Sequence, residues 1–147
     1  MNGGHRHIVG GLWHEMGRLQ LDFLCSQGLL PYHKIVDIGC GCLRAGVPLV
    51  RYLDAGNYFG TDISAALLRA GYEIELTNAG TTTRLPRGNL VEVGDFDFSW
   101  SPVQFDFALA QSVFTHLTID YLRRCLIRLN SVVKPGSSIL PLSLRYL

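Results

Sequence analysis

The sequence lacks a long hydrophobic run and lacks an excess of charge of either sign. No apolar run approaches the roughly 20 residues that a bilayer-spanning helix needs, and no apolar core of a signal peptide follows the opening MNGGHRH. Lysine and arginine number 13 against 12 acidic residues, so no charge excess indicates nucleic-acid binding. These absences argue against membrane and nucleic-acid proteins and predict a cytoplasmic protein with a small-molecule partner.

Cysteine is also scarce, with four residues in 147. A chain of this length with 48% hydrophobic residues can bury one core without disulfides, so we expect one domain with free thiols. Cys40 and Cys42 form a C-x-C pair, but a closed zinc site needs two further nitrogen or sulfur ligands near by. We therefore expect no metal.

Short apolar runs alternate with segments of helical spacing along most of the chain. The runs KIVDI (34–38) and YFGTDI (58–63) are typical of strands buried on both faces. Further strands are expected at 89–94, 105–110 and 137–144, and helices at 12–28, 47–56, 65–76 and 118–133. This alternation predicts an α/β fold with a doubly wound parallel sheet over residues 12–147, after a flexible tail at 1–11.

Two residues mark boundaries within this pattern, and a third bears on the position of a strand. Gly28 is placed to end the first long helix, and Ser64 is placed to cap the helix that begins at 65. Pro141 falls within the last expected strand, where it is unfavourable for a central position in the sheet.

A glycine turn follows the first strand in the stretch VDIGCGCLRAG. Gly39 and Gly41 lack a Cβ, so the backbone there can adopt positive φ and let a ligand approach closely. The pyrophosphate fingerprint G-x-G-x-x-G would need a third glycine where this chain has Arg44. Asp37 precedes the turn, and Asp62 follows the next strand, where a carboxylate can accept from ribose hydroxyls. The pattern favours a nucleoside over a dinucleotide.

The stretch VDIGCGCLRAG resembles motif I of the class I S-adenosylmethionine-dependent methyltransferases, and further motifs follow in order. YFGTDIS is similar to motif II, VGDFDF to motif III, FDFALAQSVFTHL to motif IV, and VVKPGSS to a late turn of the family. The resemblance covers residues 12 to 140. It implies a Rossmann-like fold with helices on both faces of a mostly parallel sheet, and S-adenosylmethionine as the cofactor.

The resemblance also implies a set of cofactor-binding residues. Asp37 would act near the ammonium group of the cofactor, while Asp62 would accept both ribose hydroxyls. Asp95 would accept from the adenine amino group, with Asp97 as a competitor for that role. The complete set is Asp37, Gly39, Gly41, Asp62, Ile63, Asp95, Phe96 and Gln111.

Each of these residues also has a purely structural interpretation. Asp37 could cap loop amides, Asp62 could be an ordinary carboxylate at a helix start, and Phe96 could belong to the core. Arg44 or Arg18 is a candidate to neutralise the methionyl carboxylate, although either could simply be solvated.

The motifs assign no catalytic residues. Methyl transfer needs the nucleophile to be oriented against the methyl group, and a general base only where the acceptor must lose a proton. His116 is expected to be structural, and Trp13 and His14 are candidates for a lid. The acceptor pocket is expected to come from residues 1–11, 77–87 or 99–102.

The chain departs from the family at its end. The family sheet has seven strands, whereas this chain stops after the fifth, so we expect it to lack the final helix and β-hairpin and to be truncated. The exposed sheet edge could lead to self-association. Three functions stay open: methyl transfer to a small acceptor at oxygen or nitrogen, a truncated or degenerate cofactor-binding module without turnover, and a nicotinamide-dependent oxidoreductase, which Arg44 argues against.

Overall fold

A computed structural model describes residues 4–8, 12–111 and 118–142 of the chain. Its centre is a five-stranded sheet in the order β3-β2-β1-β4-β5, in which every strand pairing is parallel. The strands are β1 (Ile35–Ile38), β2 (Tyr58–Asp62), β3 (Leu90–Glu92), β4 (Phe105–Gln111) and β5 (Val133–Leu142). The strand order reverses between β1 and β4, which is the topology of a doubly wound fold.

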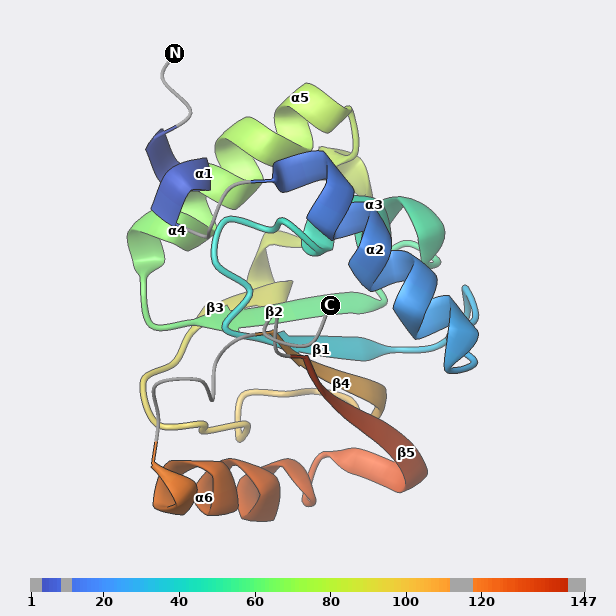
Figure 1. Ribbon diagram of the computed structural model, residues 1–147, viewed down its shortest axis with the longest axis vertical. Helices are drawn as coiled ribbons and strands as arrows, with labels where there is room; N and C mark the ends of the chain where they lie inside the picture. Colours follow the sequence, from blue (N-terminus) through green and yellow to red (C-terminus); the bar gives the residue numbers. More distant parts are fainter. Residues whose placement is uncertain (1–3, 9–11, 112–117, 143–147) are drawn as a thin grey trace.

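Helices cover both faces of this sheet (Figure 1). The elements α1 to α5 lie on one face, and α6 lies on the other. Their bounds are α1 (Gly4–Ile8), α2 (Trp13–Ser26), α3 (Gly46–Tyr52), α4 (Ala65–Ala70), α5 (Thr77–Ala79) and α6 (Ile119–Leu129). A π-helical segment, η1 (Gly71–Leu76), joins α4 to α5, and short 3₁₀ turns occur at Thr82–Arg84 and Arg87–Asn89. The predicted fold class is therefore confirmed.

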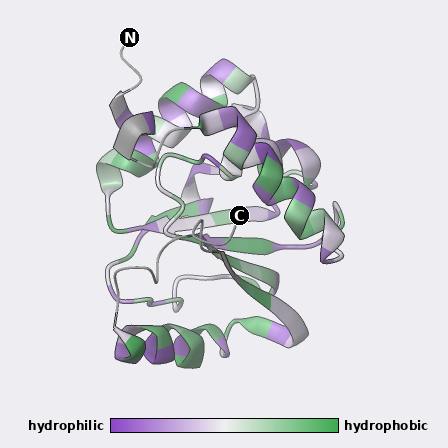
Figure 2. Ribbon diagram, in the orientation of Figure 1, coloured by the Kyte–Doolittle hydropathy of each residue, from purple (hydrophilic) through white to green (hydrophobic). Residues whose placement is uncertain are grey.

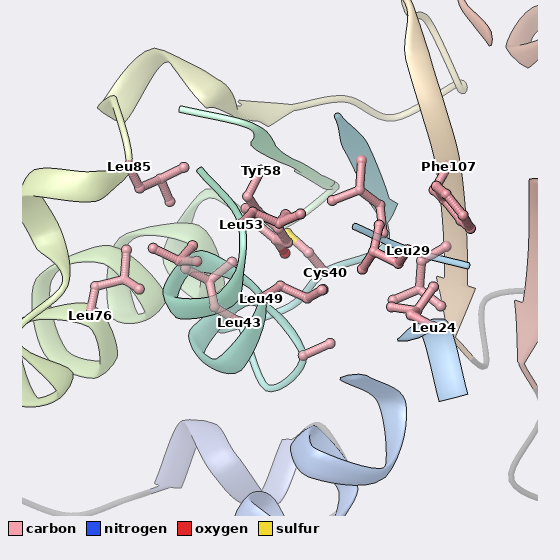
Figure 3. Packing of buried hydrophobic residues seen from close by; sticks show 14 of the residues in the cluster. Leu24, Leu29, Cys40, Leu43, Leu49, Leu53, Tyr58, Leu76, Leu85 and Phe107 are labelled. Atoms are coloured by element: carbon pink, nitrogen blue, oxygen red, sulfur yellow. The ribbon is translucent and has the colours of Figure 1, made fainter. Parts of the chain in front are cut away.

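Alternate residues of each central strand feed two separate cores. Ile35 and Tyr58 pack into the larger cluster beneath α2 to α5, whereas Val36 and Phe59 pack into the cluster beneath α6. This follows from the two-residue period of a strand, because both faces of the sheet are covered. Hydrophobic colour accordingly concentrates in the strands (Figure 2). Figure 3 shows the larger cluster, in which Tyr58 lies among the leucines.

Local boundary signals were read correctly at two positions. Ser64 caps α4, since its Oγ accepts from the amide of Leu67 at 3.3 Å. Gly28 adopts a φ of +95° just beyond α2, the left-handed conformation that a helix stop requires.

Three expectations need correction. Residues 4–8, predicted to belong to a flexible tail, form α1, which is tied to η1 because Arg6 binds both carboxylate oxygens of the buried Glu75 at 2.8 and 2.7 Å. The helix α3 ends at Tyr52 instead of residue 56, because Leu53 is already extended. The last strand begins at Val133 instead of residue 137, and its pairing with β4 is interrupted over the KPG stretch.

Pro141 lies opposite Ala110 in β5. Among the described strands β5 pairs with β4 alone, so Pro141 occupies an edge strand. A proline is tolerated there because an edge strand has one side without a ladder partner.

Candidate functional site

The glycine turn between β1 and α3 is held by the neighbouring strand β2. The amides of Gly39 and Cys40 both donate to the carbonyl of Thr61, at 2.8 and 2.9 Å. Gly39 and Gly41 have φ values of +69° and +56°, which a side chain would strain. Gly39 is exposed at the carboxyl end of β1, whereas Gly41 is buried and does not line the cavity described below, so its predicted contact with a ligand stays a prediction.

Asp62 is the carboxylate that fixes this turn. One of its oxygens accepts from the amide of Gly41 at 2.9 Å, and the other accepts from the amide of Ser64 at 2.9 Å. An ionised carboxylate offers about four lone-pair positions, so two amide bonds leave acceptor capacity on both oxygens. Asp62 can thus hold the turn and accept from a ligand at the same time.

A cavity of about 550 Å³ opens beside Asp62. Its volume falls in the range of ordinary small-molecule sites. Apolar side chains from the ends of β1 and β2, from α4 and from the segment after β3 surround the single carboxylate. The lining residues are Ile38, Gly39, Thr61, Asp62, Ile63, Ser64, Ala66, Leu67, Val93, Gly94 and Phe96. We call this space the strand-end cavity.

Four of the predicted site residues, Gly39, Asp62, Ile63 and Phe96, line the strand-end cavity. Phe96 has a φ of +50°, an uncommon conformation for a residue with a side chain. Leu67 and Val93, which were not among the predicted residues, also line the cavity. Their positions, one turn into α4 and just after β3, were the available signal.

Asp37 is buried at the end of β1, behind the turn, and does not line the cavity. The Tyr58 hydroxyl donates to its carboxyl group at 2.7 Å. Burial raises the pKa of Asp37 to about 7, and the negative charge of Asp62 raises this pKa further. The hydrogen bond from Tyr58 and the positive charge of Arg44 act in the opposite direction and lower the pKa. A direct contact with a cofactor ammonium therefore has no support in this geometry, and the proposed role stays a prediction.

Asp95 points away from the strand-end cavity toward α6. Its carboxylate forms ion pairs with Arg124 at 2.9 Å and with Arg128 at 3.0 Å, and the bond from Arg124 lowers its pKa. The competing Asp97 accepts from the amide of Ser99 at 2.9 Å and is also outside the cavity lining. Neither carboxylate lines the cavity, and the adenine role of Asp95 stays a prediction.

Gln111 lies at the carboxyl end of β4, opposite Leu142 of β5, and it does not line the strand-end cavity. His116 and the rest of the stretch that follows β4 lie outside the described residues. Their predicted roles stay predictions.

The segments proposed for the acceptor pocket are dispersed. Within 77–87, Arg84 donates to the carbonyls of Val50 and Leu53. These two residues precede β2 and lie near the amino ends of the strands, away from the cavity. Trp100, from 99–102, packs against Phe105 at the start of β4. Among these segments, α1 is the one tied to the glycine turn, because the Cys42 thiol contacts the His5 carbonyl at 3.5 Å.

All four cysteines are free, as expected. Cys40 packs so closely on β2 that a Cβ on Gly60 would lie 2.8 Å from its Sγ, whereas Cys42 faces α1. Burial raises the pKa of Cys42 to about 11, so this thiol stays protonated at neutral pH. Within the described residues no cluster of three or more potential ligands is placed to hold a metal ion.

Arg18 and Arg44, the candidates for the methionyl carboxylate, line a second space between α2 and α3 instead of the strand-end cavity. Trp13 and His14, the candidates for a lid, line the same space. We call it the interhelix groove. No described residue lines both spaces, so the structure separates these four residues from Asp62.

The order of the strands and the cavity at their carboxyl ends define an α/β domain of the doubly wound class. A family described as a methyltransferase domain matches residues 36–139, which is more than half of the chain. The chain belongs to this methyltransferase-domain family.

Solved structures with the same fold are similar to this chain at low sequence identity. They include magnesium protoporphyrin IX methyltransferase (ChlM) from Synechocystis PCC 6803 with bound SAM, at 16% identity and a TM-score of 0.65. The glycopeptide N-methyltransferase MtfA complexed with SAM has 15% identity and a TM-score of 0.70, and the PH0226 protein from Pyrococcus horikoshii OT3 has 18% and 0.72.

The chain spans roughly half the length of the first two of these structures. The matches cover 82%, 85% and 95% of this chain, but 54%, 53% and 63% of ChlM, MtfA and PH0226. None of the helices that the structure describes is long and apolar enough to cross a bilayer.

Proposed function

We propose that this domain binds S-adenosylmethionine in the strand-end cavity and serves methyl transfer to a small-molecule acceptor at oxygen or nitrogen. The observation that carries the proposal is the position of Asp62, which holds the glycine turn through Gly41 and the start of α4 through Ser64 and also lines an apolar cavity. Family membership supports it, as do the cofactor and its analogues reported in similar structures.

The residues present fit an adenosyl compound. Asp62 supplies acceptors for two ribose hydroxyls, and Gly39 lets the sugar approach the backbone. Ile63, whose side chain is 74% exposed, together with Phe96 offers apolar surface to a planar base. Burying Ile63 beneath a base would stabilise the complex by about 1.5 kcal/mol or more.

The bound cofactor would supply an activated methyl group, so the chain itself needs to orient the acceptor. Correct orientation can lower the barrier by about 7 to 11 kcal/mol in favourable cases. A general base is needed only for an acceptor that loses a proton before attack. The proposal therefore assigns binding residues and leaves the catalytic residues unknown.

Calorimetric titration with S-adenosylhomocysteine tests the cofactor assignment, because it needs no acceptor. We expect saturable binding and a higher melting temperature, since a ligand selective for the folded state stabilises it. Transfer of a labelled methyl group to a panel of small alcohols, phenols and amines then tests turnover. Binding without transfer would indicate the module without turnover, and no binding at millimolar ligand would refute the cofactor assignment.

Two further features belong to this proposal. We place the protein in the cytoplasm, with neither nucleic acid nor a membrane as a partner. Self-association through β5 is also proposed, because this strand has one described partner and carries the exposed Ile139.

A further inference from the structure

The interhelix groove is a concave space of about 330 Å³ between α2 and α3. Its floor forms where α2 meets the end of the glycine turn. A Cβ on Gly17 would lie 2.5 Å from the carbonyl oxygen of Arg44 and 3.5 Å from Cγ of Pro48. Because Gly17 lacks that atom, α2 packs directly on the backbone at Arg44. The groove lies above this contact, between the side chains of α2 and those of α3.

The walls of the groove are strongly basic. Arg18 from α2, Arg44 from the turn and Arg51 from α3 all line it, and His14 lies at the same wall as Arg18. None of the described lining residues is acidic. Three of the 13 lysine and arginine residues therefore converge on one groove in a chain whose net charge is only +1.

The three guanidinium groups are held in different ways. Arg44 is 7% exposed, so a positive charge is built into the wall itself. Arg51 donates to the carbonyl of Ala79 at 2.8 Å, which fixes its direction near the end of α5. Arg18 is 84% exposed, and its pair with Asp22 is long, at 3.8 Å. Such a surface pair is weak and can yield to a stronger anion.

Aromatic side chains complete the groove. Trp13 is almost fully buried, and the Arg6 guanidinium lies 4.9 Å from the centre of its ring. Tyr52 is held by a bond from its hydroxyl to the carbonyl of Leu29 at 2.9 Å. These contacts pre-order the walls, which lowers the entropy lost when a ligand binds.

We propose that the interhelix groove is a binding site, separate from the strand-end cavity, for a small molecule with a multiply charged oxyanion group such as a phosphate ester. Guanidinium groups form paired, charge-assisted hydrogen bonds with phosphate and carboxylate oxygens. A group with more than one negative charge is favoured, because several arginines face the same space. Arg44 also lies in the turn whose opposite side borders the strand-end cavity, so the two sites share one segment of backbone.

Pyrophosphate is the probe for this site, titrated at low ionic strength by calorimetry against the full chain. The test variant is Arg18→Gln with Arg51→Gln, because both side chains are exposed and the buried Arg44 is left intact. The control is Arg69→Gln with Arg123→Gln, which removes the same charge from exposed sites outside the groove. Losing one charge-assisted contact corresponds to about tenfold in affinity, so the test variant should bind pyrophosphate at least tenfold more weakly.

The same experiment separates this site from the cofactor site. Saturating S-adenosylhomocysteine should leave pyrophosphate binding in place, and the test variant should keep its affinity for S-adenosylhomocysteine. A second arm with citrate distinguishes phosphate esters from polycarboxylates as the source of the oxyanion. Equal pyrophosphate affinity in test and control variants would overturn the proposal. So would displacement by S-adenosylhomocysteine, which would assign the arginines to the methionyl carboxylate.

Discussion

Asp62 combines a structural and a binding role in one side chain. Its oxygens accept from Gly41 and Ser64, and the same carboxylate borders the strand-end cavity. Asp62→Ala should weaken binding of S-adenosylhomocysteine by about tenfold to a hundredfold, because hydrogen bonds to a charged group contribute about 1.5 to 3 kcal/mol. Calorimetric titration measures the change.

The matched control for Asp62→Ala is Asp120→Ala, which removes a carboxylate that is 81% exposed on α6. This control should bind as the unaltered chain does. Circular dichroism verifies that both variants are folded. An Asp62→Ala variant that is folded and binds with unchanged affinity would contradict the assignment of the ribose site.

Asp37 makes a different contribution, through its protonation. The folded-state pKa of about 7 lies above the unfolded value, so between those two values the folded state holds a proton that the unfolded state has released. The contribution of Asp37 to the free energy of unfolding must therefore fall as pH rises through this window. The slope approaches about 1.4 kcal/mol per pH unit at most.

Asp37→Asn removes this titration and keeps an acceptor for the Tyr58 hydroxyl. Urea unfolding at several pH values from about 5 to about 8 should show the unaltered chain losing stability relative to the variant as pH rises. Other groups titrate equally in both proteins, so their contribution cancels in the difference. A difference that is constant over this range would show that Asp37 is ionised throughout.

At the scale of elements, the contact between η1 and the glycine turn depends on Gly71. A Cβ at this position would lie 2.7 Å from Cγ of Leu43 and 3.0 Å from the backbone carbon of Cys42. Leu43 is fully buried, so the turn would have to move. Gly71→Ala should lower the free energy of unfolding by about 1 to 3 kcal/mol, even though alanine is the better helix former.

Gly88→Ala is the control for the substitution at Gly71, because nothing lies within 4 Å of a Cβ there. We expect this variant to be neutral or more stable by up to about 1 kcal/mol, since it restricts the unfolded chain. Thermal and urea unfolding compare the two. Equal stability of the two variants would show that η1 and the turn are not closely packed.

Elements with strong local signals were predictable from sequence, and elements fixed by distant contacts were not. The runs 34–38 and 58–63 correspond to β1 and β2, because β-branched and aromatic residues buried on both faces leave a clear pattern. The helix α1 escaped prediction because it depends on Glu75, far along the chain. The π-helical turn at Gly71 has a similar cause, since its contacts are with the glycine turn.

The candidate site divides in the same way. Gly39 and Asp62 were predictable, because the end of a parallel strand fixes where the following residues lie. Asp95 follows β3 as the motif expects, but Arg124 and Arg128 on α6 draw its carboxylate away. The interhelix groove left no motif, because its arginines come from three separate segments and meet only in the folded chain.

At the scale of the whole molecule, the described sheet is protected unequally at its two faces and its two edges. Both faces are covered by helices (Figure 1), whereas the edge strands β3 and β5 each have one described partner strand. Of the two, β5 is the longer and carries Ile139 with 37% of its surface exposed. Unpaired backbone groups along such a strand favour pairing with another chain, and a charged side chain opposes it. The chain should therefore form dimers or larger species as its concentration rises, and Ile139→Lys should shift this equilibrium toward the monomer.

Sedimentation velocity over a range of concentrations measures this equilibrium. The control is Ile127→Lys, at a side chain that is 68% exposed on α6, away from the strand. It makes the same change of charge and hydrophobicity at a helix surface, so a general gain in solubility would affect both variants equally. If the edge of β5 carries the association, the substitution at Ile139 should act and the substitution at Ile127 should not. If both lysine substitutions reduced association equally, the association would depend on exposed hydrophobic side chains in general and not on the unpaired backbone of β5.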